Sequence, residues 1–209
     1  MTPLRLADQE SAADLATYLT RAKRVDDEGD VRLQAVGEVL AAWTCVVPGR
    51  GLGHSGLVLG LRTFALAEPS QQDMTVPIAA ITDRLARGGT EIAQPPVTTR
   101  PTWSAMSPPR SGWESVGLVP DERLVVIARE GIAEVAQGAP EGSGAAAVAD
   151  LRSRVWGRET GTVPPVPAGT AFALHVLGFL RPGPDARAAV HAMGPWTRVA
   201  TDRGFVIAR

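Results

Sequence analysis

The sequence GTAFALHVLGFLRPGPDARAAVHAMGPWTRVATDRGFVIAR, residues 169–209, predicts a helix, a second helix and a β-hairpin. The apolar run from Ala168 to Leu180 is typical of a helix that is buried on nearly every side. The Ala-rich stretch from Asp185 to Met193 predicts a short helix. Thr201–Gly204 separates two apolar stretches and predicts a type I turn with a glycine bulge, which closes the hairpin.

Positive charge is concentrated in the same part of the chain. From Leu151 onward there are eight arginines and three acidic residues, whereas the whole chain has a net charge of −1. Two helices followed by a hairpin are typical of a winged helix, in which Asp185–Met193 would lie in the DNA major groove. Nucleic-acid or nucleotide binding through this basic helix–helix–hairpin is therefore one functional hypothesis.

The amino-acid usage weakens this charge argument. The chain has 21 basic residues, of which Lys23 is the one lysine, and it contains no asparagine. Such usage indicates a GC-rich genome, so that arginine also takes the ordinary solvated positions where lysine would serve. Positive charge at the carboxyl end is therefore weak evidence for nucleic acid when it stands alone.

The rest of the chain predicts an α+β protein. Leu15, Tyr18, Leu19 and Ala22 recur at helical spacing after Ser11, a possible helix cap. We expect an antiparallel sheet of four to five strands, with about six helices packed mainly on one face. Further strands are predicted over 31–35, 39–47 and 57–67, and further helices over 76–87, 120–138 and 148–157.

The longest irregular segment, residues 94–117, contains five prolines and two of the five tryptophans. We expect a single domain over 1–209, with this segment as the place where a boundary would fall. Its Trp/Arg-rich part, Thr99–Trp113, would bind a protein partner or a stacked base if exposed, and we favour a strap packed across the core. The candidate binding residues are Arg100, Trp103, Arg110, Trp113, Arg187, Trp196, Arg198 and Arg203.

A glycine-rich loop offers a second candidate site. Residues 51–56 read GLGHSG and match the dinucleotide pattern G-x-G-x-x-G, but a strand and not a helix is predicted after them, which favours a hairpin loop. A third hypothesis, a small-molecule hydrolase, would use His54 and Ser55 as base and nucleophile. The loop candidates are Gly51, Gly53, His54, Ser55 and Gly56.

No catalytic residue, cofactor or metal ligand is expected from the remaining residues. Cys45 is the one cysteine and is interpreted as a small buried hydrophobe, while His175 is interpreted as a core histidine. The amino terminus lacks a signal-peptide pattern, and no apolar run is long enough to cross a membrane. We therefore expect a cytoplasmic protein that does not contact a membrane.

Four stretches resemble small uncharacterised proteins of GC-rich actinobacteria. They begin at Gly112-Trp113 and include Val155–Glu159, Gly169–Leu180 and the closing WTRVATDRGFVIAR. The resemblance implies an actinobacterial source and a cytoplasmic setting, and it implies no activity. The leading hypothesis is a non-enzymatic cytoplasmic binding or regulatory protein of unknown ligand, with a protein or nucleic acid as its partner.

Overall fold

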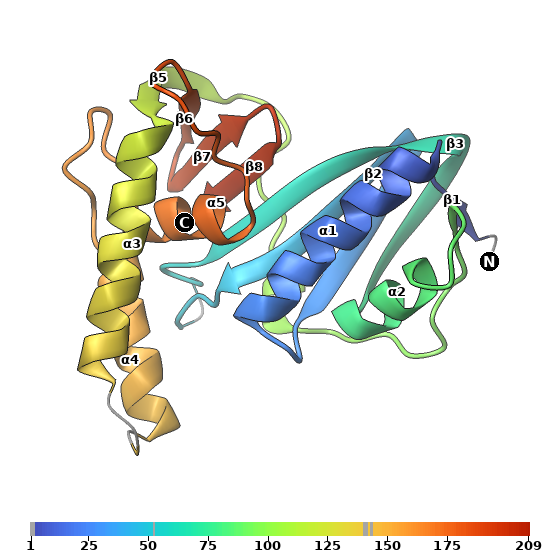
Figure 1. Cartoon of the computed structure of the whole chain (residues 1–209), viewed down its shortest axis with the longest axis horizontal. Helices are drawn as coiled ribbons and strands as arrows, with labels where there is room; N and C mark the ends of the chain where they lie inside the picture. The colour runs from blue at the N-terminus through green and yellow to red at the C-terminus, as the bar shows by residue number, and fades with distance from the viewer. Residues whose placement is uncertain (1–2, 52, 140–141, 143) are drawn as a thin grey trace. The chain divides into compact units, whose positions relative to one another are not determined.

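The computed structural model describes residues 3–51, 53–139, 142 and 144–209, and divides the chain into two compact units (Figure 1). The first unit comprises Met1–Val46 and Leu61–Ser107, and the second comprises Val47–Gly60 and Pro108–Arg209. The chain enters the second unit after Val46, returns to the first after Gly60, and passes finally into the second between Ser107 and Pro108, within the Pro-rich segment 94–117.

The first unit is built on two long neighbouring strands, β2 (Asp30–Val47) and β3 (Val58–Pro77), whose other ends belong to the second unit. Helix α1 (Gln9–Val25) lies across this hairpin (Figure 1) and buries the predicted stripe, with Asp8 instead of Ser11 as its cap. The Tyr18 hydroxyl lies 2.8 Å from Thr44 Oγ1, which fixes the helix on β2. The unit also contains β1 (Leu4–Arg5), α2 (Ile78–Leu85), β4 (Glu91–Ile92) and the 3₁₀ turn η1 (Thr102–Ala105).

The second unit holds four further strands of the main sheet, the start of β3 and three helices. The strand order of the main sheet is β2-β3-β8-β7-β6-β5, and β8 pairs with the start of β3. Helix α5 is buried from Ala168 to Leu174, as its apolar sequence predicts, but it ends at Val176 and not at Leu180. The elements are β5 (Glu114–Pro120), α3 (Asp121–Gly138), α4 (Ala145–Gly157), α5 (Ala168–Val176), β6 (Arg187–Met193), β7 (Trp196–Thr201) and β8 (Gly204–Ala208).

The helix predicted over Asp185–Met193 is wrong, because this segment is strand β6. It pairs with β5 on one side and β7 on the other, which gives its backbone hydrogen bonds that outweigh the helix propensity of alanine. Ala188 and Val190 are buried and alternate with the partly exposed Ala189 and His191, a period of two. Without this helix the winged-helix arrangement does not exist, although the hairpin β7–β8 is confirmed.

The α+β class and the antiparallel sheet predicted from the sequence are confirmed. In the described part of the chain the main sheet has six strands, a second sheet has two, and there are five α-helices. None of the described helices is both long and apolar enough to span a membrane.

Candidate binding cleft and outer sheet face

The second unit contains an open cleft of about 580 Å³, a volume within the range of ligand-binding sites. The apolar part of its lining includes Trp156, Leu57 and Pro167. Four arginines line it, together with one carboxylate, Glu159. The arginines are Arg50 from the loop between β2 and β3, Arg154 and Arg158 from the end of α4 and the residue after it, and Arg209 following β8.

Backbone hydrogen bonds hold the β2–β3 loop in place beside the cleft. Arg50 and Ser55 exchange two of them, with N···O distances of 2.9 and 3.1 Å. The Gly56 N–H donates to the carbonyl of Arg209 at 2.7 Å, and the Arg209 N–H donates to Leu57 at 3.0 Å. The end of β8 therefore joins the base of the loop, and two arginines from distant parts of the sequence both line the cleft.

Carboxylates outside the cleft neutralise part of this charge. Asp150 pairs with Arg50 at 2.8 Å and with Arg154 at 3.3 Å, and its hydrogen bond with Arg50 is the main cause of its lowered pKa. Arg158 pairs with Glu134 of α3. Because two arginines share the single carboxylate of Asp150, positive charge remains at the cleft.

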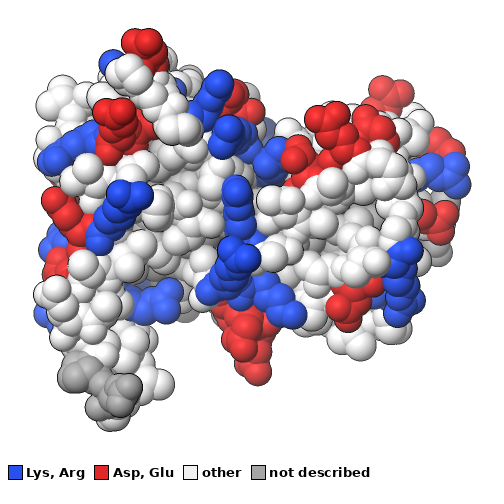
Figure 2. Space-filling view, viewed as in Figure 1, with Lys and Arg blue, Asp and Glu red and all other residues white. Residues whose placement is uncertain are grey.

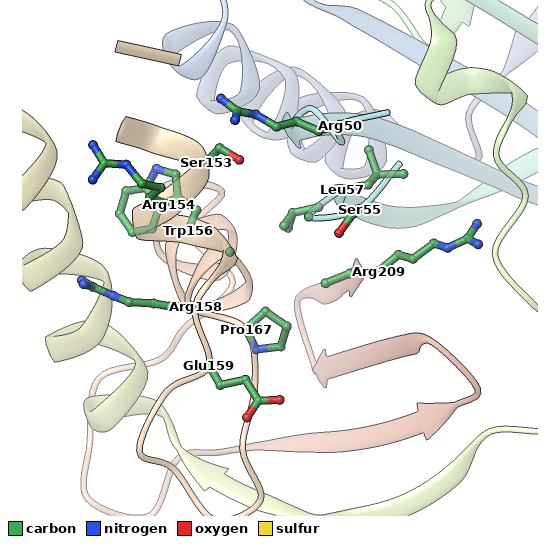
Figure 3. Close-up of a pocket in the computed structure, with 14 residues that line it drawn as sticks. Arg50, Ser55, Leu57, Ser153, Arg154, Trp156, Arg158, Glu159, Pro167 and Arg209 are labelled. Carbon is green, nitrogen blue, oxygen red and sulfur yellow. The ribbon is translucent and has the colours of Figure 1, made fainter. Parts of the chain in front are cut away.

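The guanidinium groups lie around the cleft and do not meet at one point. Figure 3 shows those of Arg154 and Arg158 on the side of α4, and that of Arg209 on the opposite side. The Arg209 guanidinium lies over the Trp196 ring, 5.5 Å from the ring centre. A partly apolar lining with separated cations at its rim suits an extended anionic ligand better than a single small anion.

The glycine-rich loop is a hairpin loop, as its sequence favours, and strand β3 follows it. A dinucleotide site of this type needs a helix at that position, whose N–H groups would face the phosphates. Ser55 lines the cleft, whereas His54, with a φ of 49°, is not among the described lining residues. The structure thus does not bring His54 and Ser55 together in the cleft as base and nucleophile.

The Trp/Arg-rich segment divides between the two units. Trp103 belongs to the first unit, where it is buried in η1. Trp113 belongs to the second unit and is partly buried, with its Nε1 donating to the carbonyl of Pro109 at 2.9 Å. The guanidinium of Arg198 lies over the Trp113 ring, 4.8 Å from its centre. In the second unit this segment therefore packs on the sheet through a partly buried Trp113.

The eight candidate residues do not form one site. Trp113, Trp196 and Arg198 lie on one face of the carboxyl-terminal sheet, which we call the outer face. Side chains of both charges are interspersed on the face that Figure 2 shows, so the net charge of the carboxyl end forms no single basic surface there. The remaining arginines of the set, Arg100, Arg110, Arg187 and Arg203, are exposed.

The arginines of the cleft were counted in the charge of the sequence, but they were not among the predicted binding residues. Arg154 and Arg158 are four residues apart, a spacing that places side chains on one side of a helix. Arg50 and Arg209 gave no such signal, because only the pairing of β8 with the loop brings them near α4.

Cys45 in β2 should react slowly with maleimides in the folded protein. Burial, with a smaller contribution from Asp26, raises the pKa of its thiol to about 12. At pH 8 the reactive thiolate is then about 10⁻⁴ of the total, against about a quarter for a free cysteine. Mass spectrometry should show labelling in urea and almost none without it, and equal rates in both would contradict the expectation.

Comparison with solved structures assigns the fold. The chain is similar over its whole length to DNA polymerase sliding clamps, with TM-scores of 0.56 for that of Pseudomonas aeruginosa and 0.57 for that of Bartonella birtlesii, at 12% and 9% identity. A putative DNA polymerase III beta subunit of Eubacterium rectale gives 0.63 at 8% identity. The chain spans 64 to 65% of the length of these proteins. Its fold is therefore sliding-clamp-like.

Comparison with family models assigns the family. The chain belongs to the family of the domain of unknown function DUF8010, whose model matches residues 1–105. A second model, the domain of unknown function DUF8185, matches residues 108–209, which include the cleft arginines other than Arg50. The search of curated proteins found no match. No group of three or more His, Cys, Asp or Glu residues in the described ranges is arranged to hold a metal ion.

Proposed function

We propose that this protein is a non-enzymatic nucleic-acid-binding protein, and that the arginines at the rim of its cleft contact backbone phosphates. The observation that carries the proposal is the grouping of four arginines around one cleft in the second unit. The sliding-clamp-like fold supports it, because the similar solved structures are named as DNA polymerase clamps. The actinobacterial resemblance is consistent with a cytoplasmic setting for this binding.

The arginines that line the cleft suit the phosphates of a nucleic-acid strand better than they suit a compact ligand. Arginine presents a planar set of N–H donors that matches a phosphate group, and a nucleic-acid strand offers several phosphates to arginines that do not meet at one point. A phosphate near Arg50 would replace the single carboxylate that this residue shares with Arg154. Contacts of this kind give affinity without base specificity.

The lining of the cleft favours binding over catalysis. Ser55 and Ser153 line it, but no histidine or cysteine is among the described lining residues. A serine nucleophile needs a base within hydrogen-bond reach, and histidine most often fills that role. We therefore propose that the protein acts by holding a strand and not by cleaving it.

Binding should depend strongly on salt. We expect labelled single-stranded and duplex DNA to bind in a fluorescence anisotropy titration, with an affinity that falls as NaCl rises from 50 to 200 mM, because cations are released from the phosphates. The double substitution Arg50→Gln with Arg158→Gln should reduce the slope of log K against log salt by about 2, roughly one for each lost phosphate contact.

The matched control is Arg203→Gln, an exposed arginine in the β7–β8 turn that does not line the cleft. It should leave the slope within error of that of the unchanged protein. Absence of binding at 50 mM NaCl, or binding that is indifferent to salt, would refute the proposed function. A protein partner would then be the next candidate to test.

A further inference from the structure

Three polar side chains form a row across the outer face of the carboxyl-terminal sheet. Ser115 of β5 is paired with His191 of β6, and His191 is paired with Arg198 of β7. Residues directly opposite one another in antiparallel strands project to the same face, with Cβ atoms about 4.5–5.5 Å apart. The pairing therefore places a hydroxyl, an imidazole and a guanidinium side by side.

Arg198 is held in place before any ligand arrives. Its guanidinium lies over the ring of Trp113, and that indole is itself anchored to the carbonyl of Pro109. Gly112, with a φ of +81°, brings the strap close to the sheet, since a Cβ atom there would lie 3.2 Å from Met193 Cε. A cation fixed in this way loses little conformational freedom when it binds an anion.

Two nitrogen atoms of the row are buried and make no hydrogen bond of good geometry. Nε of Arg198 and Nδ1 of His191 are shielded from solvent, and neither has a hydrogen-bond partner among the described residues. A buried polar group without a partner destabilises the folded state, and more so when it is charged. The row therefore carries two nitrogen atoms whose hydrogen-bonding capacity is not used by the described residues.

We propose that the row Ser115–His191–Arg198 is a binding site for a phosphate group. The guanidinium and the imidazole N–H would donate to different oxygens of the phosphate, and the Ser115 hydroxyl to a third. The row shares no residue with the cleft, so this inference does not rest on the proposed function. The phosphate belongs either to a small molecule or to the 5′ end of a nucleic acid, and the experiment distinguishes the two.

The pKa of His191 can report the binding of a phosphate, because it depends on the charges near the ring. Burial is the main cause that lowers the pKa of His191, and the positive charge of Arg198 is the second. Interactions with the backbone of Ala189 and Arg198 raise this pKa and so offset part of the shift. Other charged residues on the surrounding elements are Arg187 of β6, Glu114 of β5, Arg209 after β8 and Arg110 in the strap. A bound phosphate places negative charge beside the ring and should therefore raise the His191 pKa.

The test is a titration of the full chain with inorganic phosphate, followed by NMR of the histidine ring protons, with NaCl used to hold ionic strength constant. We expect a saturable shift of the His191 signal, identified with His191→Gln, and a higher His191 pKa at saturating phosphate. Arg198→Lys keeps the charge but loses the planar donors, and should weaken binding about tenfold. Arg203→Lys, on the same hairpin, should not change it.

A second arm uses a short DNA strand with and without a 5′-phosphate. A His191 shift that requires the 5′-phosphate assigns the site to nucleic-acid ends, and a shift with inorganic phosphate alone assigns it to small phosphorylated ligands. The inference is overturned if neither phosphate source gives a saturable shift, or if Arg203→Lys weakens binding as much as Arg198→Lys. Substitutions in the cleft, such as Arg50→Gln, should leave this titration unchanged.

Discussion

Replacing Gly204 with alanine should lower the free energy of unfolding by about 2–4 kcal/mol, because two costs act at this position. Gly204 begins β8 with a φ of +155°, a conformation that a side chain rarely adopts. A Cβ atom there would also lie 2.6 Å from Cζ of Phe179, whose ring is fully buried. Because the ring is fully buried, the clash would have to be relieved by a shift of the β8 backbone or of the Phe179 ring.

Urea denaturation followed by circular dichroism measures the change, with Gly194→Ala as the matched control. Gly194 also has a positive φ, of 54°, and lies in the neighbouring β6–β7 turn, but a Cβ atom there would meet nothing within 4 Å. The control should therefore cost about 1 kcal/mol, the price of the backbone conformation without the clash. Equal losses in the two variants would show that Phe179 plays no part.

The closing hairpin could be predicted because its signals are local. Thr201–Gly204 separates two stretches of apolar residues, and both the turn and the strands are found. The segment Asp185–Met193 misled the prediction because its alanines favour a helix, while β5 and β7, which make it a strand, lie outside it in the sequence. The alternation of Ala188 and Val190 with Arg187 and His191 was the available signal for a strand.

The candidate site was predicted less well than the fold, for a related reason. Arg50 and Asp150 are a hundred residues apart and meet through pairing that no local pattern encodes. The contact of Trp113 with Arg198 is likewise long-range, although each residue was singled out from the sequence. Sequence reasoning found residue types suited to binding, and tertiary structure decided which of them meet.

Replacing Trp156 with alanine should lower the free energy of unfolding by about 3–5 kcal/mol, the usual cost of removing a buried aromatic side chain. Trp156 stacks on Phe172 of α5 with ring centres 4.2 Å apart. Its ring also lies against Gly131 of α3, so one side chain on α4 contacts both other helices of the unit. Urea denaturation should show the loss, and a change below 1 kcal/mol would contradict this packing.

A further substitution, Gly131→Ala, tests this packing more directly. Whether it lowers or raises the free energy of unfolding should depend on the presence of the Trp156 ring. In the unchanged protein Gly131→Ala should be destabilising, since its Cβ atom would lie 2.3 Å from Cζ3 of the Trp156 ring. In the Trp156→Ala protein that ring is absent, and the same substitution should stabilise helix α3 by about 0.5–1 kcal/mol, the gain of alanine over glycine in a helix. A double-mutant cycle of urea denaturation curves measures this coupling. If Gly131→Ala has the same effect in both backgrounds, the ring does not pack on α3 and the interlocking of the three helices is refuted.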